Sequence, residues 1–143
     1  MQTPPSSPEP VVLDTNVVLD WRLFEDPGVS ALRHALDSGR VHWLATAAMV
    51  NELIHVLQRP LPSRWDPIRE RILIESPWKM ATVVEPSPAQ AHGLYCTDPD
   101  DQKFLDLAVG QGVRWLLTRD RALLALRRPA QRLGLAILQP RPW

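Results

Sequence analysis

Short apolar runs alternate along the chain with longer amphipathic segments. Five runs have the composition of strands buried in a sheet: 11–13, 42–45, 81–85, 115–117 and 135–138. Between them, apolar residues recur with helical spacing at 17–23, 26–38, 46–58, 65–76, 99–110 and 120–127. Strands that alternate with helices are typical of an α/β protein. The pattern therefore predicts an α/β sandwich with a mainly parallel central sheet.

The chain is long enough for one domain of ordinary size. It has 143 residues, and hydrophobic residues make up 45% of them, as in globular proteins that bury a core. The first ten residues contain four prolines and two serines, a composition that favours a disordered or loosely attached tail. We therefore expect residues 1–10 to form a tail and residues 11–143 to form a single domain.

Composition also excludes several classes of protein. No apolar run approaches the roughly 20 residues of a transmembrane helix, and the first residues lack the basic and apolar regions of a secretory signal. A single cysteine, Cys96, excludes an internal disulfide framework and a cysteine-rich zinc site. We expect a cytoplasmic protein that does not contact the membrane.

The charges of the chain balance. There are 16 Lys and Arg against 16 Asp and Glu, so no global positive field attracts the protein to nucleic acid. This argues against a simple DNA-binding module, but it leaves room for an enzyme that acts on nucleic acid through a local site. Arg outnumbers Lys by 14 to 2, and Arg is the better bidentate partner of a phosphate.

Two aspartates lie at the ends of predicted strands. Asp14 directly follows strand 11–13, and Asp120 follows strand 115–117 after two intervening residues. Ligand sites of open parallel sheets form at the carboxyl ends of the strands, so two central strands would bring these carboxylates to one edge. Helix capping is the alternative for each aspartate alone, because each precedes a helical segment. The equivalent positions of the pair favour a shared site.

Two further acids lie on predicted helices. At 100° per residue, Asp101 lies on the apolar face of its helix, and a carboxylate aimed at the core needs a metal or another cation. Asp98 and Asp100, in the same segment, are explained as a helix cap and a solvated charge. Glu52 lies at the edge of the apolar stripe of its helix, where a solvated surface glutamate is also common.

Four acids gathered at one end of the sheet would repel one another strongly. Such a cluster requires cations or raised pKa values to be stable. Hard oxygen ligands with open water positions suit Mg²⁺ or Mn²⁺. An ion of this kind can lower the pKa of a bound water and stabilise the leaving oxygen of a phosphodiester.

The segments that carry these acids resemble the PIN-domain family in order and spacing. They are VVLDTNVV with Asp14, MVNEL with Glu52, CTDPDDQKFLDLA with Asp101 and LLTRDRALL with Asp120. The resemblance extends over nearly the whole chain from residue 11 to residue 138. Within the family, the chain is most similar to the VapC-like toxins of bacterial toxin–antitoxin pairs.

The resemblance implies a three-layer α/β/α sandwich and an endoribonuclease that depends on Mg²⁺ or Mn²⁺. It implies that four acids hold the metal and carry out catalysis, with two polar residues in support: Asp14, Glu52, Asp101 and Asp120, and Asn16 and Thr118. Attack by water would leave a 5′-phosphate and a 3′-hydroxyl. Besides the RNA substrate, the partners implied are an antitoxin protein and a second copy of the chain in a homodimer.

Three positions depart from the family pattern. Arg119 stands where many relatives have a small residue, and Gln102 and Ala122 stand where many have additional acids. Arg119 either contacts a phosphate or fills the site and neutralises it. The missing acids leave open a non-catalytic binding or regulatory domain on the same fold. A phosphatase with an aspartate nucleophile is disfavoured, because Asn16 occupies the position of its second aspartate.

Overall fold

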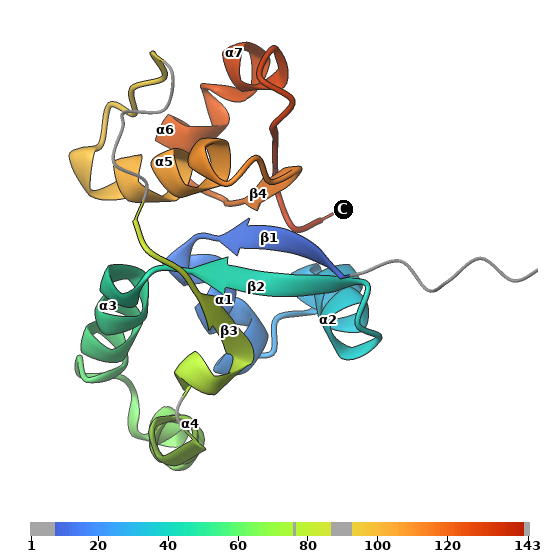
Figure 1. Cartoon of the computed structure of the whole chain (residues 1–143). Coiled ribbons are helices and arrows are strands. Elements are labelled where there is room, and N and C mark those ends of the chain that lie inside the picture. The colour runs from blue at the N-terminus through green and yellow to red at the C-terminus, as the bar shows by residue number, and fades with distance from the viewer. Residues whose placement is uncertain (1–7, 76, 87–92, 142–143) are drawn as a thin grey trace, which may run out of the picture.

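A computed structural model describes residues 8–75, 77–86 and 93–141, and its strands form one sheet (Figure 1). The strand order is β3-β2-β1-β4-β5, and every neighbouring pair is parallel. The strands are β1 (Glu9–Leu13), β2 (Val41–Ala45), β3 (Ala81–Val83), β4 (Trp115–Leu117) and β5 (Ala136–Leu138). Each strand lies at or within two residues of a predicted one, which confirms the parallel α/β architecture.

Helices cover both faces of the sheet. The α-helices are α1 (Thr15–Arg22), α2 (Ser30–Asp37), α3 (Ala47–Leu57), α4 (Asp66–Glu75), α5 (Gln102–Gly110), α6 (Arg121–Leu124) and α7 (Arg127–Gln131). Four short 3₁₀ turns join them: η1 (Pro27–Val29), η2 (Ser63–Trp65), η3 (Pro77–Met80) and η4 (Pro99–Asp101). None of the described helices is long and apolar enough to cross a membrane.

The direction in which the chain crosses the sheet decides which helices share a face. It runs from β1 to β2 and β3 in one direction, and then returns past β1 to β4 and β5. Because crossovers between parallel strands are right-handed, α1 to α4 lie on one face and α5 to α7 on the other, as Figure 1 shows. The three-layer α/β/α sandwich is therefore confirmed.

The central strand β1 is buried on both sides. Val11 and Val12 are completely buried, and Leu13 is 2% exposed. Successive strand residues point to opposite faces, so three apolar residues in a row require helices above and below the strand. On one of these faces α5 packs against β1 and β4, and its residues Phe104 and Leu105 are buried. The core therefore holds the carboxyl ends of β1 and β4 in fixed positions.

The structure corrects the boundary of the predicted tail. β1 begins at Glu9, and Glu9 and Pro10 pair with β2 in register with Val41 and His42. These two residues belong to the sheet rather than to a tail. Residues 1–7 of the predicted tail lie outside the described residues.

The helix predicted over 120–127 is wrong as a single element. α6 ends at Leu124 and α7 begins at Arg127. Pro129 has no N–H to donate to the carbonyl of Ala125, and its ring would clash with that carbonyl in a continuous helix. The chain therefore turns at Ala125 and Leu126. This break gives α6 and α7 separate directions beside β4 and β5.

Candidate metal centre

A hydroxyl group links the ends of the two central strands. Thr118, which follows β4 and is completely buried, donates its hydroxyl proton to Asp14 Oδ2 at 2.7 Å. The hydroxyl oxygen of Thr118 also accepts a hydrogen bond from the backbone N–H of Asp120 at 2.9 Å. β1 and β4 lie where the direction of the strand order reverses, the place where parallel sheets form their sites. Thr118 thus holds Asp14 and Asp120 at one end of the sheet.

Asp14 is buried and fully bonded. Its side chain begins α1, where Oδ1 accepts a hydrogen bond from the N–H of Asn16 at 3.2 Å, and only 5% of the residue is exposed. The pKa of Asp14 is raised overall, mainly by burial and also by the charges of Asp120 and Glu52. The hydrogen bonds from Thr118 and Asn16 act in the opposite direction and reduce the shift. Asn16 therefore supports Asp14 through its backbone, while its side chain is exposed.

Three aspartates, one of them Asp120, form a compact cluster beside Asp14. One carboxylate oxygen from each of Asp98, Asp101 and Asp120 lies within 4.8 Å of the others. Asp120 Oδ1 caps α6 by accepting from Ala122 N at 2.7 Å and Leu123 N at 3.4 Å. Capping and clustering are compatible here, because a carboxylate that caps with one oxygen can present its other oxygen to the cluster.

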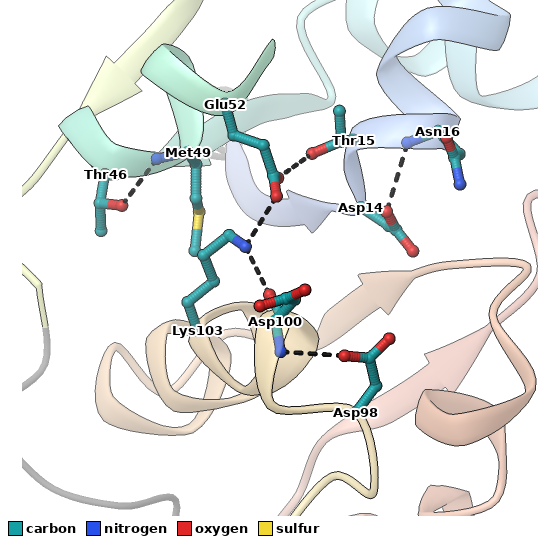
Figure 2. Close-up of polar contacts among 9 residues, drawn as sticks. All are labelled: Asp14, Thr15, Asn16, Thr46, Met49, Glu52, Asp98, Asp100 and Lys103. Atoms are coloured by element: carbon teal, nitrogen blue, oxygen red, sulfur yellow. Dashed lines mark hydrogen bonds and ion pairs between the residues drawn. The ribbon is translucent and has the colours of Figure 1, made fainter. Parts of the chain in front are cut away.

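Asp98 was predicted only as a cap. It does cap the 3₁₀ turn η4, since its Oδ1 accepts a hydrogen bond from Asp100 N at 3.0 Å, and Figure 2 shows this contact. A 3₁₀ helix has three residues per turn, so side chains three apart lie above one another. Asp98 and Asp101 lie on one side of the turn, as residues three apart also do on an α-helix, so their spacing alone could have indicated the contact.

Asp101 is the most perturbed acid of the cluster. Burial raises its pKa from 3.8 to about 7, and the charges of Asp120, Asp14 and Asp98 add to the effect. Its Oδ2 atom is buried and has no hydrogen-bond partner within the described part of the chain. An oxygen in this state is costly to maintain unless a proton or a cation satisfies it.

Glu52 lies apart from the three clustered aspartates. Its Oε2 accepts the hydroxyl proton of Thr15 at 2.5 Å, and its Oε1 accepts from Lys103 Nζ at 3.0 Å. Lys103 also donates to the backbone carbonyl of Asp100, so it joins α3 to the turn that carries Asp101 (Figure 2). The charge of Glu52 is thus partly neutralised by a lysine that the sequence did not identify.

Arg119 is bound to two acids outside the cluster. Its Nη1 lies 2.8 Å from Asp20 Oδ2 and 3.3 Å from Asp26 Oδ2. A Cβ atom on Gly28 would lie 2.6 Å from Arg119 Nη2, so a side chain there would displace the guanidinium from its present position. Arg119 therefore fastens the loop after α1 to the end of β4, and its ion pairs are with Asp20 and Asp26 rather than with the cluster.

Gln102 replaces an acid for a structural reason. Its Nε2 donates to the carbonyl of Leu94 at 2.9 Å and to Asp106 Oδ1 at 3.0 Å, and its Oε1 accepts from Cys96 N at 2.6 Å. Only an amide can donate and accept in this way. The side chain joins the segment before η4 to α5, and these hydrogen bonds hold the turn that carries Asp101 in place.

The donor set suits a hard divalent cation. The cluster offers only carboxylate oxygens, which Mg²⁺ and Mn²⁺ prefer, and Asp101, whose Oδ2 has no partner among the described residues, is one of its three members. A cation there would satisfy that oxygen and remove the repulsion that raises the pKa of Asp101. The residues present therefore fit a metal site at the end of β1 and β4.

A comparison with protein families decides the assignment. The family model described as PIN domain matches residues 10–122, which contain β1 to β4 and all the acids discussed above. The chain belongs to the PIN-domain family. No curated protein matches it.

PIN domains are generally nucleases, and the family typically binds divalent metal ions. The acid cluster of this PIN domain is compatible with both properties. The structure brings Asp101 and Asp120 together with the unpredicted Asp98, places Asp14 beside them, and pairs Glu52 with Lys103. The catalytic and metal-binding roles of the four predicted acids stay predictions, as do the supporting roles of Asn16 and Thr118.

Proposed function

We propose that this PIN domain is an endoribonuclease that depends on Mg²⁺ or Mn²⁺ and hydrolyses RNA phosphodiesters. The observation that supports this most directly is the buried, unpartnered oxygen of Asp101 within a cluster of carboxylates. No hydrogen bond or salt bridge among the described residues satisfies this oxygen, and a cation shared with the neighbouring carboxylates would do so. Membership of a family of nucleases adds the reaction class.

In this proposal the ion is held by Asp101, Asp120 and Asp98, with Asp14 completing the site. When bound, the metal supplies Lewis-acid chemistry, since it lowers the pKa of a water and stabilises charge on the phosphate. Thr118 keeps Asp14 in place by donating its proton to Oδ2. A bond forms between a water oxygen and phosphorus, and the bond from phosphorus to the 3′-oxygen breaks. The products are a 5′-phosphate and a 3′-hydroxyl.

The test is cleavage of mixed single-stranded RNA in Mg²⁺, Mn²⁺ or EDTA. Asp14→Asn and Asp101→Asn are each expected to abolish cleavage while the fold remains, because each removes a charge from the site. Asp100→Asn is the matched control: it removes an exposed charge from the same 3₁₀ turn and should cleave like the wild type. Unchanged cleavage by purified Asp14→Asn or Asp101→Asn, or equal cleavage in EDTA, would overturn the proposal.

We also propose that the nuclease is the toxin of a bacterial toxin–antitoxin pair, which acts in the cytoplasm as a homodimer. The similarity of the DTN and TDPDD segments to VapC-like toxins supports this extension. Expression of the wild-type chain should stop growth, and Asp101→Asn should not. A small upstream gene with a DNA-binding start and an amphipathic end should relieve the arrest. If calorimetry detects no Mn²⁺ binding, the non-catalytic alternative is favoured instead.

A further inference from the structure

The balanced net charge of the chain conceals a strong asymmetry along it. Residues 114–143 contain seven arginines and a single acid, Asp120. The first 113 residues therefore carry fifteen of the sixteen acids and nine of the sixteen cations. Because α6 and α7 lie in this basic segment, one region of the surface is locally positive although the whole protein is neutral.

An open hollow gathers three of these arginines. It has a volume of about 330 Å³ and is lined by Arg121, Leu124, Ala125, Arg127 and Arg128 from α6, α7 and the turn between them. All three arginines are exposed. None of their guanidinium groups forms a salt bridge with a carboxylate among the described residues. Their charge is therefore available to a ligand.

A second hollow that also contains arginines differs from this one, because acids line it. It lies between α1, α2 and α4 and also contains three arginines, but three acids line it as well: Glu25, Asp37 and Glu75. One of these acids, Glu75, lies 3.3 Å from Arg22. The charges of that hollow are balanced by the protein itself, whereas the hollow of α6 and α7 has no acid in its lining.

The basic hollow begins next to the acid cluster in the sequence. Arg121 directly follows Asp120, so their Cα atoms are about 3.8 Å apart. Arg127 and Arg128 begin α7, after the break that follows α6. The break at Ala125 and Leu126 turns α7 so that Arg127 and Arg128 line the same hollow as Arg121. The hollow therefore begins at the residue next to Asp120, a member of the acid cluster.

We propose that the hollow of α6 and α7 binds the phosphodiester backbone of the RNA substrate beside the cleavage site. Planar guanidinium groups bind phosphate oxygens bidentately, and contacts to phosphates carry affinity without reading sequence. The hollow also answers an electrostatic difficulty, because an acid cluster alone repels a polyanion. This inference rests on the proposed function for the identity of the substrate.

The test measures binding of a fluorescein-labelled, single-stranded RNA by the full chain in EDTA, where metal-dependent cleavage does not occur. The variant Arg121→Gln/Arg127→Gln/Arg128→Gln should bind on the order of tenfold more weakly. The slope of log affinity against log salt should fall by about two, at roughly 0.7 for each lost contact to single-stranded nucleic acid. Thermal unfolding should be unchanged, because the substituted side chains are exposed.

The matched control removes the same charge elsewhere. Arg40→Gln/Arg59→Gln/Arg71→Gln substitutes three exposed arginines of the other half of the chain, and it should bind RNA nearly as tightly as the wild type. An equal loss of RNA affinity in both triple variants would mean that net charge alone determines binding, and it would overturn the inference. RNA binding at the wild-type affinity by the Arg121, Arg127 and Arg128 variant would overturn it too. Tighter binding of polyglutamate than of RNA, with the same dependence on the arginines, would also overturn it.

The inference and the proposed function fail in different ways. RNA that binds through these arginines but is not cut in Mg²⁺ or Mn²⁺ contradicts the nuclease and supports the hollow. RNA that is cut with the same KM by wild type and triple variant supports the nuclease and contradicts the hollow. If both hold, the triple variant raises KM while kcat stays unchanged.

Discussion

The negative charge of Asp101 is expected to lower the free energy of unfolding of the metal-free protein. The pKa of this carboxyl is raised from 3.8 to about 7, which means that the folded protein disfavours its ionised form. Linkage converts such a difference into about 4 kcal/mol once the group is ionised in both states. Because the carboxyl is partly exposed, solvent screening reduces the expected cost to about 2 kcal/mol. Asp101→Asn removes this cost.

The sign of the effect fixes its pH window. Below about pH 4, Asp101 is protonated in the folded and the unfolded chain, so its charge has no effect on stability. Between about pH 4 and 7 only the unfolded chain releases the proton, and the free energy of unfolding of the wild type falls. Above pH 7 the full cost is present. Asp101→Asn should therefore match the wild type at pH 4 and exceed it by about 2 kcal/mol at pH 8.

Urea unfolding and thermal unfolding in EDTA at pH 4 and pH 8 measure this difference. For a chain of this size, 2 kcal/mol corresponds to a rise in Tm of roughly 4 to 8 °C. Mg²⁺ or Mn²⁺ should stabilise the wild type and not the variant. Asp100→Asn is the control and should show neither effect, because its carboxylate is exposed. A variant that is no more stable than the wild type at pH 8 would refute the reasoning.

Two further substitutions test the residues that support the acids. Thr118→Val leaves Asp14 Oδ2 and the N–H of Asp120 without their partner, so urea unfolding should show a loss of about 2 kcal/mol in the free energy of unfolding. Thr118→Ser keeps the hydroxyl group and should keep most of the stability. A valine variant as stable as the wild type would contradict the stabilising role of these hydrogen bonds. Gln102→Glu restores an acid that many relatives have, but it removes both Nε2 donations and adds a charge beside Asp106. Thermal unfolding should therefore show a loss of about 1 to 3 kcal/mol, and cleavage should fall rather than rise.

The sequence predicted the sheet well because its central strands β1, β2 and β4 are largely buried. An uninterrupted apolar run such as Val11 to Leu13 has few other interpretations in a soluble α/β chain. The convergence of Asp14 and Asp120 also followed from position alone, since both come after strands that proved to be parallel neighbours. Capping and clustering looked like rival explanations of these aspartates, but Asp120 does both, while Asp14 caps α1 and lies outside the three-aspartate cluster.

The features that the sequence missed depend on local geometry or on distant partners. Asp98 joins Asp101 and Asp120 while it also caps η4, and its assignment as a cap alone overlooked that residues three apart lie on one side of a helix. Lys103 pairs with Glu52, which lies 51 residues away along the chain, and nothing in the local pattern around Lys103 indicates this partner. The break between α6 and α7 was predictable from Pro129, whose effect reaches four residues back.

The order of the strands has a consequence for the protein during its synthesis. The hydroxyl of Thr118 and the carboxylate of Asp14 that it fixes are separated by 104 positions, and β4 must insert beside β1 before they can meet. A nascent chain that still holds residue 120 in the ribosomal tunnel contains its first acids but no assembled centre. Under the proposed function, a partly synthesised chain would therefore lack nuclease activity until β4 has paired with β1.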